Sequence, residues 1–295
     1  MSTSVRPPVD SGTVLVTGAS AGIGKELASQ VAARAGTLVL LARRVDRLEE
    51  LRAELVARHP QLRVVVLPAD LSDEADVTRV LQRVRDQVGE IDVLINNAGI
   101  GDSVLFDRSS WSRTRQLLAT NVLAPAQLTA ALVPHMVARG RGGVLNIGSG
   151  AGLTVLPGAA AYTGSKHFVD GFSEALRADL AGTGVVVTQV CPGPVESEFD
   201  QAASSAGGMT GGPPQALRIS AKQCAREALA GFDRGAPLVF PGRPYRLLMH
   251  LLPLLPRRAQ RLQTARAARQ LRARTAAPGT QAPAGASEGT GTTTP

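Results

Sequence analysis

Short apolar runs alternate with amphipathic stretches along most of the chain. In 45–58, Leu48, Leu51 and Leu55 recur at helical spacing, so one face of that stretch is apolar. Helices are predicted after the first apolar run and at 45–58, 74–88, 111–138 and 160–181. The apolar runs resemble strands buried on both faces and lie at 12–18, 37–43, 62–70, 91–99, 142–149, 184–193 and 237–240. The alternation predicts one doubly wound α/β domain with a parallel, Rossmann-like sheet over residues 12–242.

Three stretches fall outside this alternation. Residues 1–11 are predicted to be a flexible N-terminus, and residues 276–295, rich in Ala, Gly, Thr and Pro, a disordered tail. Residues 200–216 combine glycine, proline and small side chains. They form either a floppy loop or a mobile lid over a substrate, since long irregular loops in compact domains are often functional.

The net charge of +8 arises at the C-terminus. Residues 241–295 hold nine arginines and one acid, Glu288, so residues 1–240 are neutral. With aromatics at 3%, a base-stacking surface is disfavoured and no nucleic acid partner is expected. Two cysteines and four histidines without ligand spacing predict no metal and a reduced setting. The chain shows neither an apolar signal segment nor the run of ~18 apolar residues that a spanning helix needs, so we expect a cytoplasmic protein.

Residues 243–275 form a basic extension around an apolar segment. Residues 247–255 are mostly leucine, interrupted by His250 and Pro253 and flanked by arginines. One interpretation is weak peripheral contact of 243–274 with the inner membrane face, through leucines among acyl chains and arginines on anionic headgroups; a lipophilic substrate would then be favoured. The other is a helix that caps its own domain or a partner subunit.

A glycine-rich turn joins the first predicted strand to the first helix. It reads TGASAGIG over 17–24. Glycines permit the tight turn and a close approach of backbone to a pyrophosphate, and the helix N-terminus offers free N–H groups. The turn therefore predicts dinucleotide binding by Gly18, Ser20, Gly22, Ile23 and Gly24.

The end of the second strand bears on the choice of cofactor. It reads Ala42-Arg43-Arg44, where an acid would bind a free ribose 2′-hydroxyl. A guanidinium can neutralise a 2′-phosphate, so Arg43 and Arg44 favour NADP(H) over NAD(H). The alternative is that one arginine simply faces solvent.

Three side chains suggest proton-transfer chemistry. Tyr162 and Lys166 are four residues apart in a predicted helix, which places them on one face. A phenol of pKa about 10 is a poor base near neutrality, but an adjacent ammonium lowers that pKa. Ser149 follows a predicted strand, at the sheet edge where open α/β folds bind ligands, and its hydroxyl can bind a substrate oxygen. The alternative is a Tyr/Lys pair on a solvated helix face.

Together these motifs identify a family resemblance. TGASAGIG (17–24), NNAG (96–99), Asn121, Ser149, the Tyr162/Lys166 pair and PGPVES (192–197) resemble the short-chain dehydrogenase/reductase superfamily, in its single-domain branch, over residues 12–240. The resemblance implies hydride transfer between nicotinamide C4 and a carbonyl carbon, with Tyr162 as acid and base and Ser149 bound to the substrate oxygen. It also implies that the backbone of Asn121 holds a proton-relay water, and that Lys166, with Tyr162, contacts the nicotinamide ribose.

The resemblance further implies a set of cofactor contacts. Asp70 would contact the adenine, although a turn or helix-capping role is the alternative. The remaining implied contacts are Asn97, Ala98 and Gly99 at the adenosine ribose, and Pro192, Gly193, Val195 and Ser197 at the nicotinamide. The alternative is that the asparagines mainly brace the sheet. Relatives of this kind are typically homo-oligomers.

We therefore expect an NADP(H)-dependent enzyme acting on a small-molecule carbonyl or alcohol. An NAD(H)-dependent alcohol dehydrogenase of the same family is the nearest alternative. A nucleotide-sugar epimerase would carry TGxxGxxG and a larger C-terminal domain, and a non-catalytic NADP sensor would lack Tyr162 or Ser149. An arginine-rich nucleic-acid binder would show a steep dependence of binding on salt.

Overall fold

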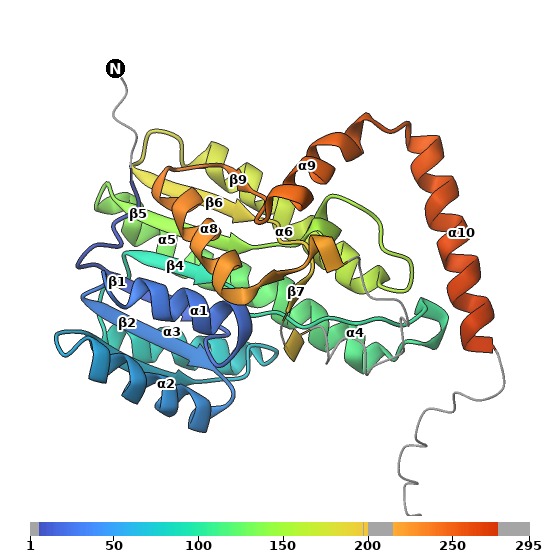
Figure 1. Cartoon of the computed structure of the whole chain (residues 1–295). Helices are drawn as coiled ribbons and strands as arrows, with labels where there is room; N and C mark the ends of the chain where they lie inside the picture. The colour runs from blue at the N-terminus through green and yellow to red at the C-terminus, as the bar shows by residue number, and fades with distance from the viewer. Residues whose placement is uncertain (1–5, 197, 200–214, 277–295) are drawn as a thin grey trace, which may run out of the picture.

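The computed structural model describes residues 6–196, 198–199 and 215–276. A parallel seven-stranded sheet in the order β3-β2-β1-β4-β5-β6-β9 forms its centre (Figure 1). Its strands are β1 (Thr13–Thr17), β2 (Thr37–Ala42), β3 (Arg63–Pro68), β4 (Val93–Asn96), β5 (Gly142–Ile147), β6 (Val185–Val190) and β9 (Leu238–Val239). Because the strand order reverses beside β1, the carboxyl ends of β1 and β4 flank the crevice where such sheets bind ligands.

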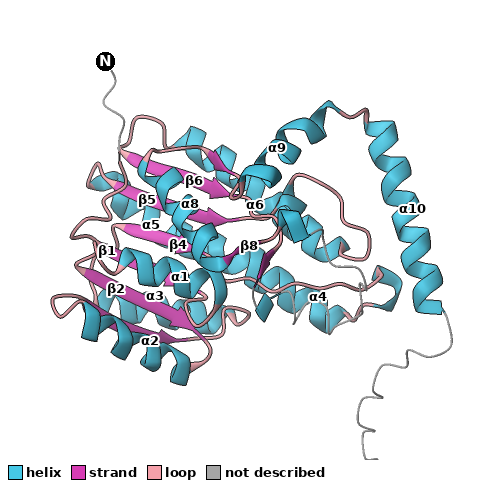
Figure 2. Ribbon diagram, in the orientation of Figure 1, coloured by secondary structure: helices cyan, strands magenta, loops and turns pink. Residues whose placement is uncertain are grey.

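Helices cover both faces of the sheet, as Figure 2 shows. Those on one face are α1 (Gly22–Val31), α2 (Val45–Arg58) and α8 (Ala221–Asp233), and those on the other are α3 (Glu74–Gln87), α5 (Ala124–Ala138) and α6 (Ala160–Asp179). Successive strand residues point to opposite faces, so Val14 and Val16 join one core and Leu15 the other. The predicted fold class is therefore confirmed.

One long helix departs from regular geometry midway. α4 (Trp111–Leu118) continues through a π-helical turn (Ala119–Leu123) into α5. The whole stretch Trp111–Ala138 is long and apolar enough to cross a membrane by length and composition. Its apolar residues are explained by packing, because Leu128 and Met136 are buried in the core beside the sheet. π-turns within helices often mark functional sites.

Residues 6–11 differ from the predicted flexible N-terminus. Val9 is only 1% exposed and belongs to the core. Arg34 contacts Asp10 at 2.7 Å and Asp233 at 2.8 Å, which fastens this segment to α8. The sequence PPV offers no periodicity from which this packing can be read.

The basic extension folds into α9 (Arg243–Leu251), a 3-10 turn (Leu252–Leu254) and α10 (Arg257–Ala276). Tyr245 and Met249 are 6% exposed and pack with Cys191 and Phe240, so α9 caps its own domain. The globular unit thus continues past residue 242. Figure 1 shows α10 standing apart from the sheet; it returns to the body through Arg272, which binds both carboxylate oxygens of Asp107 at 2.8 and 3.0 Å.

A second, very small sheet was not predicted. β7 (Val195–Glu196) pairs in parallel with β8 (Ile219–Ser220). Two-residue strands are too short to show a pattern of alternation. The predicted lid spans 200–216, of which 200–214 lie outside the described residues.

Candidate functional site

The glycine turn after β1 is held against the end of β4. Gly18 adopts φ +68°, and a Cβ at Gly24 would lie 2.2 Å from the carbonyl oxygen of Gly18, so both positions require glycine. The hydroxyl of Thr17 accepts hydrogen bonds from the amides of Asn97 and Ala98, at 2.9 and 3.0 Å. Thr17 is a residue that sequence reasoning missed, although a hydroxyl at the last position of the strand was visible.

Asn97 and Asn96 brace the sheet, as one alternative predicted. The Asn97 amide donates to the carbonyl of Thr17 at 2.9 Å. Asn96 donates to Asn146 at 2.9 Å and to Thr129 at 3.1 Å. These bonds fix the turn while leaving the backbone of Ala98 and Gly99 at the crevice.

Arg44 lies beside the glycine turn and forms an ion pair with a carboxylate side chain. Its Nη2 donates to Ser20 Oγ at 3.3 Å, and its Nη1 contacts Glu198 at 2.9 Å. Arg47 contacts the other oxygen of Glu198 at 2.6 Å, and these hydrogen bonds lower the pKa of that carboxyl. Arg47 was not predicted. Two guanidiniums beside the glycine turn thus bind one carboxylate, and such a pair can bind an anionic group.

Asp70 serves as a turn residue at the end of β3. Its Oδ1 accepts hydrogen bonds from the amide of Ser72 at 2.9 Å and from the Ser72 hydroxyl at 2.8 Å. Arg43 approaches its other oxygen at 4.0 Å. Helix capping falls instead to Asp73, which accepts from Ala75 N at the start of α3.

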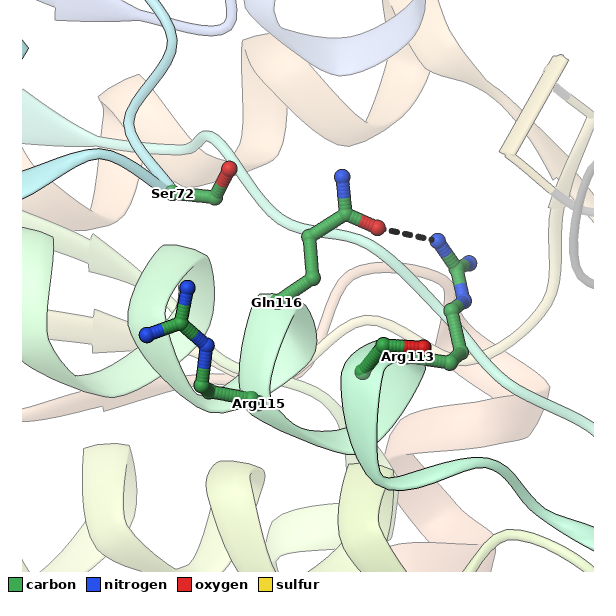
Figure 3. Close-up of a pocket in the computed structure, with 5 residues that line it drawn as sticks. Ser72, Arg113, Arg115 and Gln116 are labelled. Atoms are coloured by element: carbon green, nitrogen blue, oxygen red, sulfur yellow. Dashed lines mark hydrogen bonds between the residues drawn. The ribbon is translucent and has the colours of Figure 1, made fainter. Parts of the chain in front are cut away.

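A cavity of about 380 Å³ lies next to this turn (Figure 3). Ser72 lines one side, and Ser112, Arg113, Arg115 and Gln116 of α4 line the other. Arg113 donates to Gln116 at 3.0 Å, the bond drawn in Figure 3. The cavity adjoins Asp70 through Ser72, so it borders the predicted adenine end of the cofactor site and not the predicted catalytic side chains.

Tyr162 and Lys166 lie on the same side of α6. The ammonium of Lys166 is 5.9 Å from the centre of the Tyr162 ring. Lys166 is 5% exposed and donates to the carbonyl of Ile147 at 2.9 Å. Burial lowers the pKa of Lys166 to about 8 because desolvation disfavours the charged form. The Tyr162 ring also lies 5.9 Å from that of Phe199.

The turn that carries Ser149 packs on the same helix. Ser149 caps a short 3-10 turn, Gly150–Gly152, by accepting from Ala151 N at 3.2 Å. A Cβ at Gly152 would lie 2.5 Å from the carbonyl oxygen of Lys166, so this glycine allows the turn to approach α6. Ser149 is half-buried, at the carboxyl end of β5.

Asn121 occupies the π-helical turn. Its side chain exchanges two hydrogen bonds with the backbone of Ile100, at 2.9 and 3.0 Å, and donates to Ser165 at 3.1 Å. A Cβ at Gly99 would lie 3.4 Å from Asn121 Oδ1 and 3.7 Å from the Lys166 nitrogen. The structure therefore brings Asn121, Gly99 and Lys166 together.

The predicted nicotinamide segment follows β6. The carbonyl of Pro192 accepts from Gly150 N at 3.0 Å, which joins the segment to the serine turn. Gly193 lies against Tyr245, and Val195 is 5% exposed in β7. Ser197 lies outside the described residues. Among those that are described, no group of three or more His, Cys, Asp or Glu could hold a metal.

Comparison with known proteins places this geometry in context. The model of the family described as short chain dehydrogenase matches residues 12–207. An uncharacterised oxidoreductase of Myxococcus xanthus is 42% identical over 191 residues, which are 63% of this chain and 73% of that protein. A short-chain dehydrogenase from Sphingobium yanoikuyae in complex with NADPH is similar with a TM-score of 0.71 and 32% identity, over 92% of this chain and 99% of that one. A bulky-bulky ketone specific alcohol dehydrogenase from Comamonas testosteroni has a TM-score of 0.69 and 28% identity, over 92% and 97%.

Proposed function

Because the chain belongs to the short-chain dehydrogenase family and is an oxidoreductase, we propose that it interconverts a small-molecule carbonyl and a secondary alcohol using NADP(H). The observation that carries this proposal is the buried ammonium of Lys166, 5.9 Å from the Tyr162 ring. It lies between Gly99 and the carbonyl of Ile147, at the carboxyl edge of the sheet.

Each polar side chain has a distinct task in this proposal. Tyr162 gives its proton to the carbonyl oxygen during reduction and takes it back during oxidation, and Lys166 lowers its pKa through its positive charge. Ser149 donates a hydrogen bond to the same oxygen. Asn121 anchors the relay water at the π-turn. When bound, NADP(H) supplies or accepts the hydride.

NADP(H) is favoured over NAD(H) by the charges beside the glycine turn. Arg44 and Arg47 already hold the carboxylate of Glu198, and a 2′-phosphate offers the same guanidiniums more charge. The proposed contacts otherwise follow the sequence: Gly18, Ser20, Gly22, Ile23 and Gly24 for the pyrophosphate, with the adenosine and nicotinamide residues given above. The NADPH-bound relative supports this choice.

A panel of ketones, aldehydes and alcohols tests the proposal, followed by absorbance of the reduced cofactor with NADPH and NADH in parallel. We expect turnover with NADPH and at least tenfold less with NADH. The Tyr162→Phe variant should bind NADPH and turn over nothing. A Tyr162→Phe variant that keeps its activity would refute the role of Tyr162, whereas NADPH binding without turnover of any substrate by the wild type would favour an NADP sensor.

We further propose that the outer face of α9 contacts an anionic membrane surface on the cytoplasmic side. Five leucines on α9 and on the turn that follows it are 41–77% exposed (Leu247, Leu248, Leu251, Leu254 and Leu255). This strip is unusually apolar for a soluble surface. Residues 243–274 hold nine arginines and no acid, so like charges oppose pairing of this face with its own copy. The charges instead suit anionic lipids. A lipophilic substrate follows from this placement.

Sedimentation with phosphatidylglycerol vesicles tests this contact. We expect the full chain to sediment with them and not with phosphatidylcholine, and a variant carrying Leu247→Ser, Leu251→Ser and Leu254→Ser to stay in solution. Equal behaviour of the two proteins would discard the contact.

We also propose that the chain forms a homo-oligomer through other surfaces. Light scattering after size-exclusion chromatography measures the oligomeric state directly.

A further inference from the structure

α9 returns to the catalytic edge although it lies beyond the residues that match the family model, 12–207. Tyr245 is one of its two buried residues, at 6% exposure. Its ring meets that of Phe240 edge-on, with centres 6.3 Å apart, and packs in the cluster that contains Cys191 and Met249. Tyr245 is one of two tyrosines in the chain, and these contacts hold its ring in place.

Two glycines create the space that Tyr245 fills. A Cβ at Gly150 would lie 1.8 Å from the Tyr245 Oη, and a Cβ at Gly193 would lie 2.6 Å from its Cδ2. The backbone of both glycines therefore touches the ring. Neither glycine has a positive φ, so the absence of a side chain is explained by the approach of Tyr245 and not by a turn.

These glycines belong to the two loops that matter most for the proposed chemistry. Gly150 directly follows Ser149, and Gly193 lies in the predicted nicotinamide segment. The loops are joined to each other by a backbone hydrogen bond, from Gly150 N to Pro192 O at 3.0 Å. The Tyr245 ring lies across that junction and touches both sides of it.

Tyr245 is unsuited to act as a second acid or base. Burial raises its pKa, and the neighbouring Tyr162 and Cys191 raise it further. The phenol therefore stays protonated wherever Tyr162 would react, and the contacts of its ring with the two glycines are what the geometry assigns to it.

We infer that Tyr245 is a positioning residue, which sets the separation between the Ser149 turn and the nicotinamide segment by filling the slot between Gly150 and Gly193. This inference rests on the proposed function. It makes the C-terminal extension a part of the working site and not only a cap on the fold.

A rescue experiment tests the slot. Gly150→Ala places a methyl group against the Tyr245 hydroxyl, so we expect kcat for carbonyl reduction to fall about 100-fold, as misplacement by an ångström can cause, with the Kd for NADPH changed less than about threefold. Adding Tyr245→Phe removes the hydroxyl and leaves Cζ as the nearest ring atom, at 3.1 Å. The double variant should regain at least tenfold in kcat.

Two further variants make the outcome decisive. Gly171→Ala is the matched control, because a Cβ at Gly171 meets nothing within 4 Å. Tyr245→Leu should fold, since Leu keeps the slot apolar. It should lower kcat with KM nearly unchanged. This variant provides the test if Gly150→Ala does not fold. An active Gly150→Ala variant, a double variant no better than Gly150→Ala, or a fully active Tyr245→Leu would overturn the inference. In that case an inactive Tyr162→Phe variant would still support the proposed function, whereas an active one would refute both.

Discussion

The ammonium of Lys166 donates a hydrogen bond to the carbonyl of Ile147 at 2.9 Å, two residues before Ser149. This bond ties the helix that carries Tyr162 to the strand that leads to the serine. The same nitrogen is 5.9 Å from the centre of the Tyr162 ring. One buried charge thus sets both the geometry and the electrostatics of the proposed site.

Replacing this charge should strongly reduce turnover without unfolding the protein. Lys166→Met keeps the apolar stem but cannot lower the pKa of Tyr162 or hold Ile147. We expect kcat to fall by about 10³, within the range that positioned acid–base groups contribute. Steady-state kinetics with NADPH measure the loss, and circular dichroism checks the fold. A fall of less than tenfold would show that Lys166 does not tune Tyr162.

The buried lysine also predicts how stability depends on pH. Its pKa is about 8 in the folded chain and near its ordinary value of 10.5 once unfolded. Between these values the unfolded chain binds the proton and the native chain does not, so stability rises with pH. Between pH 8 and 10 the free energy of unfolding of the wild type should therefore rise relative to that of Lys166→Met. Urea titrations at pH 7 and pH 10 measure this difference, and an unchanged difference would contradict the shift.

The two arginines at the glycine turn should separate the cofactors. Arg44→Ala removes charge-assisted hydrogen bonds worth about 1.5–3 kcal/mol each, so the Kd for NADPH should rise by about tenfold or more while that for NADH changes little. Glu198→Gln should act in the opposite direction, lowering the Kd for NADPH, because the carboxylate no longer occupies the guanidiniums. Fluorescence titration measures the Kd of both cofactors. Parallel changes in the Kd for NADPH and for NADH would rule out a 2′-phosphate contact.

Thr17 should matter for cofactor binding although it is buried. Thr17→Val removes the acceptor for two amides, those of Asn97 and Ala98, at a cost of about 1–3 kcal/mol in stability. The glycine turn then loosens and the Kd for NADPH rises. Thr17→Ser keeps the hydroxyl and is the control. Calorimetry should show stability falling in the order wild type, Thr17→Ser, Thr17→Val, and NADPH titration should show affinity falling in the same order. Equal values for the Ser and Val variants would show that the hydroxyl is dispensable.

Asn121 offers a separate test of the π-turn. Asn121→Ala leaves the amide and carbonyl of Ile100 without their side-chain partners, and Asn121 is 2% exposed. Unfolding should become easier by about 2 kcal/mol and kcat should fall. Asn121→Asp restores the acceptor alone and should recover part of the stability. Urea denaturation that shows no difference between wild type and alanine would contradict this account.

The strands and the glycine turn were predictable because they depend on local pattern. Uninterrupted apolar runs reach both cores of the sheet, and TGASAGIG encodes a turn between neighbouring elements. The positions of Asn97 and Asp70 could be predicted, but their contacts could not. An amide or a carboxylate can brace a turn, bind a ligand or do both. The pattern does not distinguish these tasks.

Contacts between distant segments could not be predicted. Tyr245, Gly150 and Gly193 come from three separate parts of the chain, and α9 is apolar on its inner and its outer side, so the spacing of its leucines does not say which side is buried. Arg47 reads as one more charge on a helix until Glu198 is brought to it from 151 residues away.

The clamp that Arg34 forms between Asp10 and Asp233 has a consequence for biosynthesis. Arg34 meets Asp10 only 24 residues away, but its second partner, Asp233, is synthesised 199 residues after it. The clamp is therefore completed only once α8 has left the ribosome.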